Sequence, residues 1–164
     1  MQQRKALNIP FGAVAGLIEK DGKFLLVREN RNGGTEHGLW NHPAGMIDAG
    51  ENPIEAVKRE VQEETGHTFT PTYFLGVYSL IKKHLEEELG GIEQPIKLVF
   101  TGTISEEPRN ELSNDISEIK WFTQEEIEAM NSDTLRDADI KKIVRDYMAG
   151  ERISLDRVVH TVMK

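Results

Sequence analysis

The sequence predicts a mixed β-sheet with helices packed on it, in the α/β or α+β class. Two observations predict this class. Strand-like runs come both before and after one strongly amphipathic helical segment, and two more helical segments follow the last of these runs. The chain has 164 residues, a length that suits one hydrophobic core, so we expect a single domain over residues 1–164.

The strand-like runs begin with a hairpin. Residues 11–19 and 23–29 are rich in β-compatible side chains, and they flank Asp21-Gly22, a dipeptide that favours a tight turn. The Gly- and Asn-rich segment 30–45 follows, and we expect at least part of it to be a loop that either is a plain surface turn or faces a substrate. Further strand-like runs lie near residues 68–81, 96–104 and 116–122.

The helical segments carry capping signals. In the first helix, Asn52 suits the N-cap position, Pro53 suits the first helical position, and Gly66 marks the end. Its apolar residues recur at spacings of three and four, which gives one stripe for the core. That stripe consists of Ile54, Val57 and Val61. Two later helices are expected, one capped by Thr123 and one near residues 138–149.

The composition excludes several classes of protein. The chain has 28 acidic and 20 basic residues, a formal net charge of −8 and no strong basic cluster, so binding of long nucleic acid is not expected. It has no cysteine, which excludes disulfides and thiolate metal sites. No apolar run approaches the ~20 residues that a membrane span needs, and the N-terminal stretch lacks the apolar core of a signal peptide. We therefore expect a cytoplasmic protein without membrane contact.

Negative charge is concentrated in residues 45–66, which carry six acidic and two basic side chains. Residues three and four apart share a face of a helix, so Glu60 neighbours both Glu63 and Glu64. We expect these carboxylates to lie beside the buried stripe rather than within it. Because the segment has only two cations, we do not expect alternating salt bridges to neutralise the cluster.

A bound cation would resolve the repulsion between these carboxylates. Mg²⁺ prefers oxygen ligands, keeps several waters, and binds through a few carboxylates together with substrate phosphates. Such an ion would also reverse the local sign of the charge, so that an anionic diphosphate could dock on an acidic protein. The alternative is a solvated helix face without a ligand, because repulsion between exposed carboxylates costs only about a few tenths of a kcal/mol per pair.

The wider pattern in residues 45–67 resembles the Nudix box, the signature of the Nudix (MutT-like) hydrolases. The matching positions are Gly45, Glu51, Arg59, Glu60, Glu63, Glu64 and Gly66, with Val61 at the aliphatic position. One position departs from the family pattern. His67 stands where an aliphatic residue is usual, and we expect a change of local packing there without loss of activity.

The resemblance extends over most of the chain through "GAVAGLI", "LWNHPAG" and "EIKWFTQEEI". It implies a Nudix-type α/β/α sandwich with a mixed sheet and a box that folds as loop-helix-loop. Within the superfamily, "LWNHPAGMIDAGE" and the tail "LRDADIKKIVRDYMAGERISLDRVV" look most like the NudJ-type phosphatases, a much weaker similarity than that of the box.

The resemblance also implies an activity. Nudix hydrolases let water attack phosphorus and break a phosphoanhydride bond, here in a nucleoside tri- or diphosphate or a related small organic pyrophosphate. By similarity, Glu60, Glu63 and Glu64 are metal ligands, and the Gly45 carbonyl is a further one. The implied cofactor is Mg²⁺, with Mn²⁺ as a substitute. We expect Glu60 also to help deprotonate the attacking water.

Other residues receive supporting roles from the same resemblance. We expect Arg59 to orient a glutamate and Glu51 to anchor the loop-helix-loop, rather than to bind phosphate. A general base outside the box is common in the superfamily, and the candidates are Glu93, Asp115 and Glu118. Glu118 is preferred because it lies three residues before Trp121 in the segment that resembles the final strand of the family, although a plain surface position is the simpler interpretation.

Other interpretations stay open at this point. The chain could be a non-catalytic Nudix-fold module that binds or senses a nucleotide, although its box glutamates are all present. Homodimers are common in the superfamily, so a homodimer is a further expectation. The box does not define the substrate, and the sequence leaves open the role of residues 82–95 and of the C-terminal tail.

Overall fold

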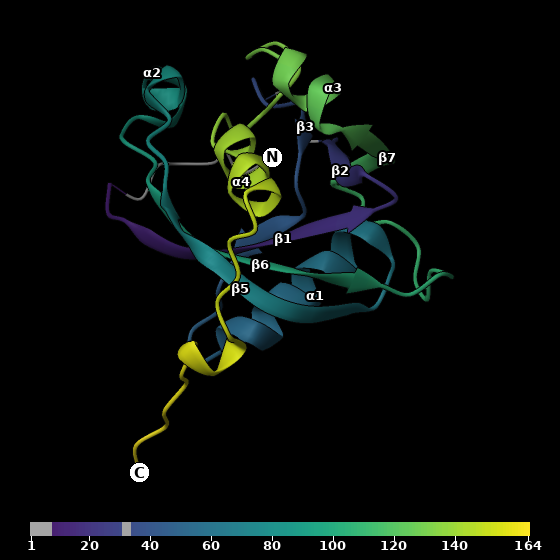
Figure 1. Ribbon diagram of the computed structural model, residues 1–164. Coiled ribbons are helices and arrows are strands. Elements are labelled where there is room, and N and C mark those ends of the chain that lie inside the picture. The colour runs from purple at the N-terminus through teal and green to yellow at the C-terminus, as the bar shows by residue number, and fades with distance from the viewer. Residues whose placement is uncertain (1–7, 31–33) are drawn as a thin grey trace.

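The computed structural model describes residues 8–30 and 34–164, and these residues form seven strands and four α-helices (Figure 1). The strands are β1 (Phe11–Lys20), β2 (Lys23–Glu29), β3 (Trp40–Asn41), β4 (Ala44–Met46), β5 (Phe69–Ser79), β6 (Pro95–Ile104) and β7 (Ile116–Thr123). The helices are α1 (Pro53–Thr65), α2 (Glu86–Leu89), α3 (Gln124–Ala129) and α4 (Ile140–Met148), with the 3₁₀ turns η1 (Lys83–Leu85) and η2 (Leu155–Arg157).

The strands form one mixed sheet in the order β3-β2-β1-β6-β5, with β4 paired to β1 and β7 paired to β2. Strand β1 runs parallel to β6, while its pairings with β2 and β4 are antiparallel. The turn between β1 and β2 lies at Asp21 and Gly22, which both have positive φ, 52° and 76°. The predicted hairpin is thereby confirmed, because this backbone conformation favours Asp and Gly.

Helix α1 packs on one face of the sheet through its apolar stripe. Val57 and Val61 are fully buried in a cluster with Phe100 of β6. The helix approaches β1 closely at Gly16, where a Cβ atom would lie 2.6 Å from Cγ2 of Val61. A glycine at this position therefore decides how near α1 lies to the sheet.

Helices α3 and α4 cover the opposite face. Ile127 of α3 and Ile143 of α4 are fully buried in a second cluster with Leu26 of β2. The sheet thus lies between α1 on one side and α3 and α4 on the other (Figure 1). This arrangement confirms the expected α/β/α sandwich with a mixed sheet.

The structure differs from the predicted elements in detail. Strand β3 and the first two residues of β4 lie in segment 30–45, which we expected to contain a loop. Residues 31–33 of that segment lie outside the described residues. These strands have two and three residues, too few for an alternating pattern to reveal them. Helix α4 begins at Ile140 rather than near residue 138, because residues 137 and 139 turn towards a buried ion-pair network described below.

Residues 80–94 leave the sheet between β5 and β6 and carry η1 and α2. The base of this excursion is closed by hydrogen bonds from Leu80 N to Pro95 O, at 3.2 Å, and from Lys82 N to Glu93 O, at 3.3 Å. Within the part of the chain that the structure describes, no helix combines the length and apolar character needed to cross a membrane.

Candidate active site

The box segment, residues 45–67, folds as the end of β4, a loop, α1 and a turn. The side chain of Asn52 caps α1 by accepting a hydrogen bond from Ile54 N at 2.9 Å, and Pro53 opens the helix. At the other end, Gly66 has a φ of 76°, and its N–H donates to Gln62 O at 2.9 Å. Both ends of the helix are therefore held by local hydrogen bonds, which confirms the predicted caps.

Arg59 lies at the centre of the box. Its Nε and Nη2 atoms donate to the two carboxylate oxygens of Glu51, at 2.8 and 2.9 Å. Its Nη1 atom donates to Glu60 at 2.6 Å and lies 3.5 Å from a carboxylate oxygen of Glu63. These hydrogen bonds to Arg59 lower the pKa of Glu51 to about 2. The expectation of an acidic cluster without salt bridges is wrong. The guanidinium of Arg59 forms ion pairs with Glu60 and Glu63 of α1 and with Glu51 of the preceding loop.

Glu60 lies against the backbone of β4. A Cβ atom built on Gly45 would lie 2.0 Å from Cδ of Glu60, so only glycine leaves room for this carboxylate. The side chain of Glu60 is 13% exposed. Burial raises the pKa of Glu60, while the hydrogen bond from Arg59 opposes that rise.

Glu64 is buried, which corrects the expectation that all three carboxylates lie beside the buried stripe. One of its carboxylate oxygens accepts a hydrogen bond from Ala44 N at 3.0 Å. Burial, together with the nearby charge of Glu29, raises the pKa of Glu64 to about 8. The helix periodicity could not show this burial, because the partner of Glu64 is the Ala44 amide of β4, a different element.

Glu63 and Glu118 lie apart from these buried groups. The side chain of Glu63 is 55% exposed on α1. Glu118 of β7 is 49% exposed, and it lies opposite Arg28 of β2, with an ion-pair distance of 3.6 Å. Adjacent residues of a strand point to opposite faces. Arg28 and Glu118 therefore point away from the α1 face, and the structure does not bring Glu118 together with the box glutamates.

The other two candidates for an outside base also lie elsewhere. Asp115 is exposed in the turn before β7, where its carbonyl accepts a hydrogen bond from Asn30 N at 2.7 Å. Glu93 is buried at the base of the excursion between β5 and β6.

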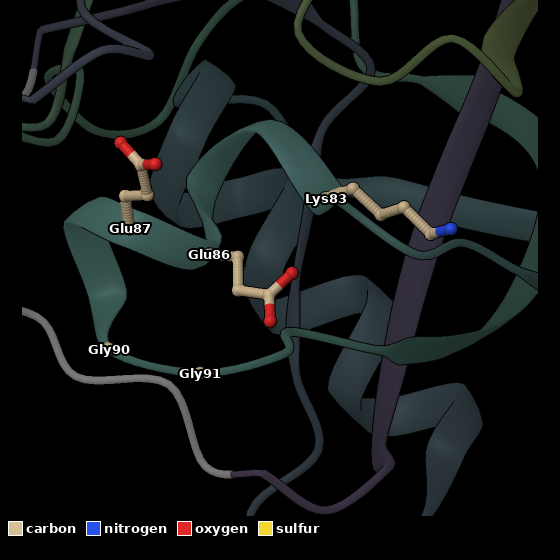
Figure 2. Close-up of a pocket in the computed structure, with 5 residues that line it drawn as sticks. All are labelled: Lys83, Glu86, Glu87, Gly90 and Gly91. Atoms are coloured by element: carbon tan, nitrogen blue, oxygen red, sulfur yellow. The ribbon is translucent and has the colours of Figure 1, made fainter.

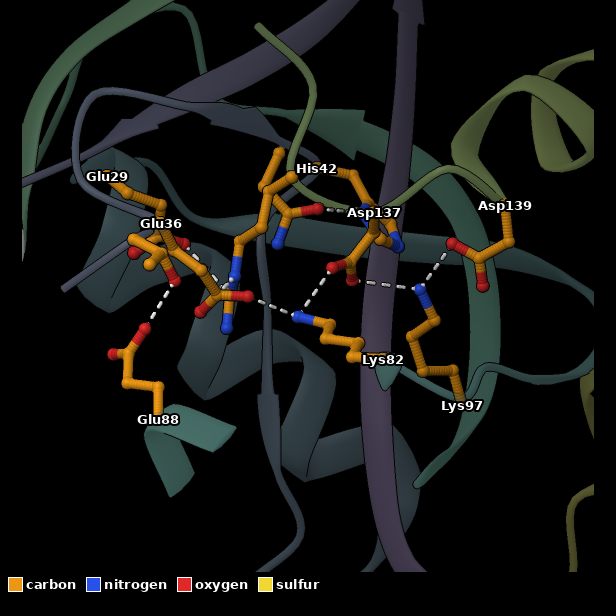
Figure 3. A network of polar contacts seen from close by, with 11 residues as sticks. Glu29, Glu36, His42, Lys82, Glu88, Lys97, Asp137 and Asp139 are labelled. Atoms are coloured by element: carbon orange, nitrogen blue, oxygen red, sulfur yellow. Dashed lines mark hydrogen bonds and ion pairs between the residues drawn. The ribbon is translucent and has the colours of Figure 1, made fainter. Parts of the chain in front are cut away.

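A buried network of charged side chains lies next to the box (Figure 3). It contains three cations and four carboxylates, and their side chains are between 1 and 13% exposed. Its ion pairs are Arg136–Glu29 (2.8 Å), Arg136–Glu36 (2.9 Å), Lys82–Glu36 (2.6 Å), Lys82–Asp137 (2.8 Å), Lys97–Asp137 (3.1 Å) and Lys97–Asp139 (2.7 Å). Burial by itself raises the pKa of Asp137, but Lys97 and Lys82 hold it well below its usual range.

The network joins the box through the segment that carries β3. The backbone of Arg136 donates to Trp40 O at 2.8 Å, and Trp40 N donates to Thr134 O at the same distance. This segment continues to Ala44, the residue whose amide holds Glu64. Arg136 therefore holds the backbone that leads to the site as well as the Glu29 carboxylate beside it.

His42 lies in the same segment and is fully buried. Its Nδ1 atom pairs with Oδ1 of Asn41 at 2.8 Å, whereas its Nε2 atom has no hydrogen-bond partner among the described residues. Burial lowers the pKa of His42 well below its usual range, and Lys97 lowers it further, so the ring is neutral. The sequence analysis singled out none of the seven charged residues of the network.

A signal for one of the missed residues was present in the sequence. Lys97 interrupts the apolar run "IKLVF" of β6. It lies two residues before the buried Val99, so both side chains point to the same, inward face of the strand. A lysine at an inward position of a strand is almost always paired when buried, so this pattern could have indicated a buried anion partner. The partners themselves had no such signal, because they lie in irregular segments.

A hollow of about 650 Å³ lies on the excursion between β5 and β6, lined by Lys83, Glu86, Glu87, Gly90 and Gly91 (Figure 2). Its lining consists of charged side chains of one short segment and two glycines. None of the box residues contributes to this hollow, and we assign no part of the candidate active site to it.

The donors of the box suit a hard cation in their chemistry. Glu60, Glu63, Glu64 and the Gly45 carbonyl offer oxygen atoms only, the ligand type that Mg²⁺ prefers. Across residues 8–30 and 34–164, no group of three or more His, Asp or Glu side chains is arranged so that it could hold a metal ion by itself. Arg59 contacts two of these glutamates, so the box supplies a donor set rather than a closed cage. Such a donor set fits an ion that takes its remaining ligands from water and substrate.

Comparisons with known proteins agree with this geometry. The chain matches the family model of the NUDIX domain over residues 10–147. It is 31% identical over 150 residues to phosphatase NudJ from Escherichia coli (strain K12), covering 91% of this chain and 90% of that protein. A NUDIX hydrolase from Nitrosomonas europaea has a TM-score of 0.80 at 33% identity, covering 93% of this chain and 98% of that chain. A MutT protein from Methanosarcina mazei Go1 has a TM-score of 0.70 at 29% identity, covering 90 and 100%.

These matches define the class of protein, and the chain belongs to the Nudix family. It is a Nudix hydrolase, an enzyme of the pyrophosphohydrolase type. Nudix hydrolases generally use divalent metal ions, in keeping with the oxygen donors that α1 and β4 present.

Proposed function

We propose that this Nudix hydrolase is a Mg²⁺-dependent enzyme that cleaves a phosphoanhydride bond in a nucleoside tri- or diphosphate or a related small organic pyrophosphate. Water attacks phosphorus, the bridging P–O bond breaks, and the departing phosphate or phosphate ester takes the electron pair. One observation carries this proposal: α1 presents Glu60, Glu63 and Glu64, and the Glu60 carboxylate lies next to the Gly45 backbone.

In this proposal, Glu60, Glu63, Glu64 and the Gly45 carbonyl would hold the ion. The chemistry that Mg²⁺ supplies when bound is neutralisation of diphosphate charge and a lower pKa for coordinated water. Mn²⁺ would take the same oxygen donors. Arg59 holds Glu60 and ties it to Glu51, so that it orients a carboxylate instead of gripping substrate.

Two groups remain as proposed bases. Glu60 is our first choice, because it is held in place between Arg59 and the β4 backbone. Glu118 is the weaker proposal, because it is paired with Arg28 on the other face of the sheet. A Glu118→Gln variant with normal turnover would remove it from the mechanism.

The buried network supports the site through its backbone rather than through its charge. Its three cations are all paired with its four carboxylates, so it supplies no net positive charge for an anion. The choice of substrates therefore comes from the family and the relative: the phosphatase NudJ relative is compatible with release of phosphate from nucleotides or from pyrimidine pyrophosphates of the thiamine-precursor type.

The experiment is a turnover assay on a panel of nucleoside tri- and diphosphates, nucleotide sugars and thiamine precursors, with and without Mg²⁺. Glu63→Gln is the informative variant, because this side chain is half exposed and its loss leaves the core intact. We expect turnover to fall by roughly a hundredfold or more.

Glu55→Gln is the matched control. It makes the same change on the same helix, at an exposed glutamate paired only with Lys58 among the described residues. Metal-dependent turnover that is lost in Glu63→Gln and kept in Glu55→Gln is the expected result. Equal turnover in the two variants would contradict the assignment of the box as the catalytic centre.

A further inference from the structure

A second hollow lies on the α1 face of the sheet, beyond the C-terminal end of that helix. It has a volume of about 760 Å³, within the range of ~300–1,000 Å³ that small-molecule sites usually have. Its floor is apolar and comes from four strands. The floor residues are Ile18 of β1, Leu25 of β2, Ile104 of β6, and Ile119 and Trp121 of β7.

The hollow exists because α1 is shorter than the sheet it covers. The floor residues share the face on which α1 packs, and Trp121 lies directly opposite Leu25 in the ladder. The last buried apolar residue of α1 is Val61, and the helix ends at Thr65. Beyond that end, the apolar face continues without a covering helix, and Ile119 and Trp121 stay half exposed.

Two lysines stand at the rim of the hollow. Lys20 and Lys23 are directly opposite each other beside the turn of the β1–β2 hairpin, and both are exposed. Like charges directly opposite in a ladder are unfavourable. Neither lysine forms an ion pair with any residue that the structure describes. A bound anion would relieve this repulsion.

Acidic residues also line the rim, and their positions matter for this argument. Glu19 is already engaged, because its two carboxylate oxygens accept hydrogen bonds from Gly22 N at 2.6 Å and from the Tyr147 hydroxyl at 3.4 Å. Asp21 lies within the turn, and Glu106 lies across the hollow on the loop after β6. The lysine pair is thus the concentrated positive feature of this rim.

His67 contributes a directional polar group. Its Nδ1 atom lies 2.7 Å from Ser105 O, and a carbonyl oxygen can only accept, so Nδ1 carries the proton. With the proton on Nδ1, the lone pair of Nε2 can accept a hydrogen bond. This residue is the one departure from the box pattern, and it lies in the lining of the hollow rather than in the buried core.

The hollow is separate from the hydrolase centre. None of the glutamates of the box lines it. Lys23 at its rim and Glu29 beside the box stand at opposite ends of β2, and six residues of strand span roughly 20 Å. A molecule in this hollow would therefore not occupy the position of the diphosphate.

We propose that this hollow is a second ligand site, which takes a small planar heteroaromatic molecule carrying a phosphate or carboxylate group. The ring packs against the indole of Trp121, the usual partner of a flat π-system in proteins. The anionic group lies between Lys20 and Lys23, and a ring N–H or exocyclic amine donates to Nε2 of His67. The proposal does not depend on the activity of the box.

The test is an NMR titration of the full chain, labelled with ¹⁵N, in the presence of EDTA. The probes are AMP, 6-aminonicotinate, adenosine and inorganic phosphate. AMP carries a phosphate and 6-aminonicotinate a carboxylate, whereas adenosine tests the ring without an anion and inorganic phosphate tests the anion without a ring. The two indole N–H signals belong to Trp40 and Trp121, and a Trp40→Phe variant assigns them. We expect AMP or 6-aminonicotinate to shift the Trp121 signal and to bind at least about tenfold more tightly than adenosine or phosphate.

The matched pair of variants is Lys23→Glu and Lys120→Glu. Both change the charge equally, and Lys120 lies next to Trp121 but points to the other face of β7, where it contacts the Phe122 ring. Lys23→Glu should weaken binding at least about tenfold, whereas Lys120→Glu should not. Equal affinities of the two variants, or shifts confined to Trp40, would overturn the proposal. Turnover with Mg²⁺ should be unchanged in Lys23→Glu, so a failure of the hydrolase assignment would be seen separately.

Discussion

Glu60, Glu63 and Glu64 each have their own environment, although all three lie on α1. Glu63 is half exposed, Glu60 fits against the backbone at Gly45, and Glu64 is buried on the amide of Ala44. The less exposed a carboxylate is, the more its charge destabilises the folded protein, because a buried carboxylate has lost its hydrating water. Substitutions at these positions should therefore differ in their effect on stability even if all of them abolish turnover.

Arg59 allows a prediction at this scale. Its guanidinium holds both oxygens of Glu51 and also reaches Glu60, a geometry that lysine cannot reproduce because it lacks the planar fork. Arg59→Lys should lower kcat by about tenfold or more, with a smaller change in KM. Steady-state kinetics on a hydrolysed substrate will measure the changes in kcat and KM separately. Lys58→Ala, on the exposed side of the same helix, should keep both constants, and an equal loss there would contradict the orienting role.

Glu36 allows a second prediction, on stability and pH. Burial by itself raises the pKa of Glu36, but Arg136 and Lys82 overcome that effect and lower it to about 2. The ordinary value in the unfolded chain is higher, so the ionised carboxylate stabilises the fold above a pH of about 4.5. This contribution is lost as the pH falls from about 4.5 towards 2.

Glu36→Gln should therefore lower the free energy of unfolding at pH 7 by on the order of 3 kcal/mol. The difference from the unsubstituted protein should shrink as the pH falls below about 4.5. Urea unfolding at a series of pH values will measure it. A difference that stays constant down to pH 3 would show that the ion pairs of Glu36 do not supply this stability.

At the scale of elements, two glycines decide how α1 meets the sheet. Gly16 of β1 lets Val61 approach, and Gly45 of β4 lets the Glu60 carboxylate approach. The first contact is part of the core, whereas the second belongs to the candidate active site. Helix α1 thus has two close contacts with the sheet. The contact at Gly16 contributes to stability, and the contact at Gly45 positions a functional group.

Substitution of each glycine by alanine should separate these two roles. Gly16→Ala would place a Cβ atom 2.6 Å from Val61, and overpacking of this kind costs about 1–3 kcal/mol. Gly45→Ala would instead displace the end of a flexible side chain, so it should change stability by less than about 1 kcal/mol while kcat falls at least about tenfold. Thermal unfolding and turnover of both variants will measure these effects. Normal turnover in Gly45→Ala would show that Glu60 does not need this position.

At the scale of the whole molecule, the distribution of charge is the dominant feature. The chain has a formal net charge of −8, yet it buries Lys82, Lys97 and Arg136 together beside the box. Buried ion pairs contribute little to stability compared with apolar packing, since their desolvation is costly. Positioning of the segment that carries β3 and leads to Ala44 is therefore a better reason for this network than the stability of the fold.

A further prediction concerns the metal. An ion that binds only the folded protein stabilises it by about 2.7 kcal/mol at 100 times its Kd. Mg²⁺ or Mn²⁺ should therefore raise Tm, EDTA should reverse the rise, and Glu60→Gln should reduce it. Differential scanning calorimetry without substrate will show this effect independently of turnover. An identical rise in Tm for Glu60→Gln and the unsubstituted protein would place the ion elsewhere.

Local parts of the fold could be predicted from the sequence. The caps Asn52 and Gly66, the hairpin turn at Asp21-Gly22 and the core stripe of α1 each depend on residues close together in the chain, and the structure confirms them. Strands β3 and β4 could not be predicted, because two or three residues carry no period and their pairing partners come from β1 and β2.

The sequence by itself determined that this protein has a Nudix box, because its glycines and glutamates lie at set spacings on one helix and its flanking loops. Only the tertiary structure decided that Arg59 joins three of these glutamates and that Glu64 is buried. The same holds for the network of Glu29, Lys97 and Asp137, whose members come from three distant segments. The physical reason is that helix spacing is a local property, whereas burial and ion pairing depend on which remote segments the sheet brings together.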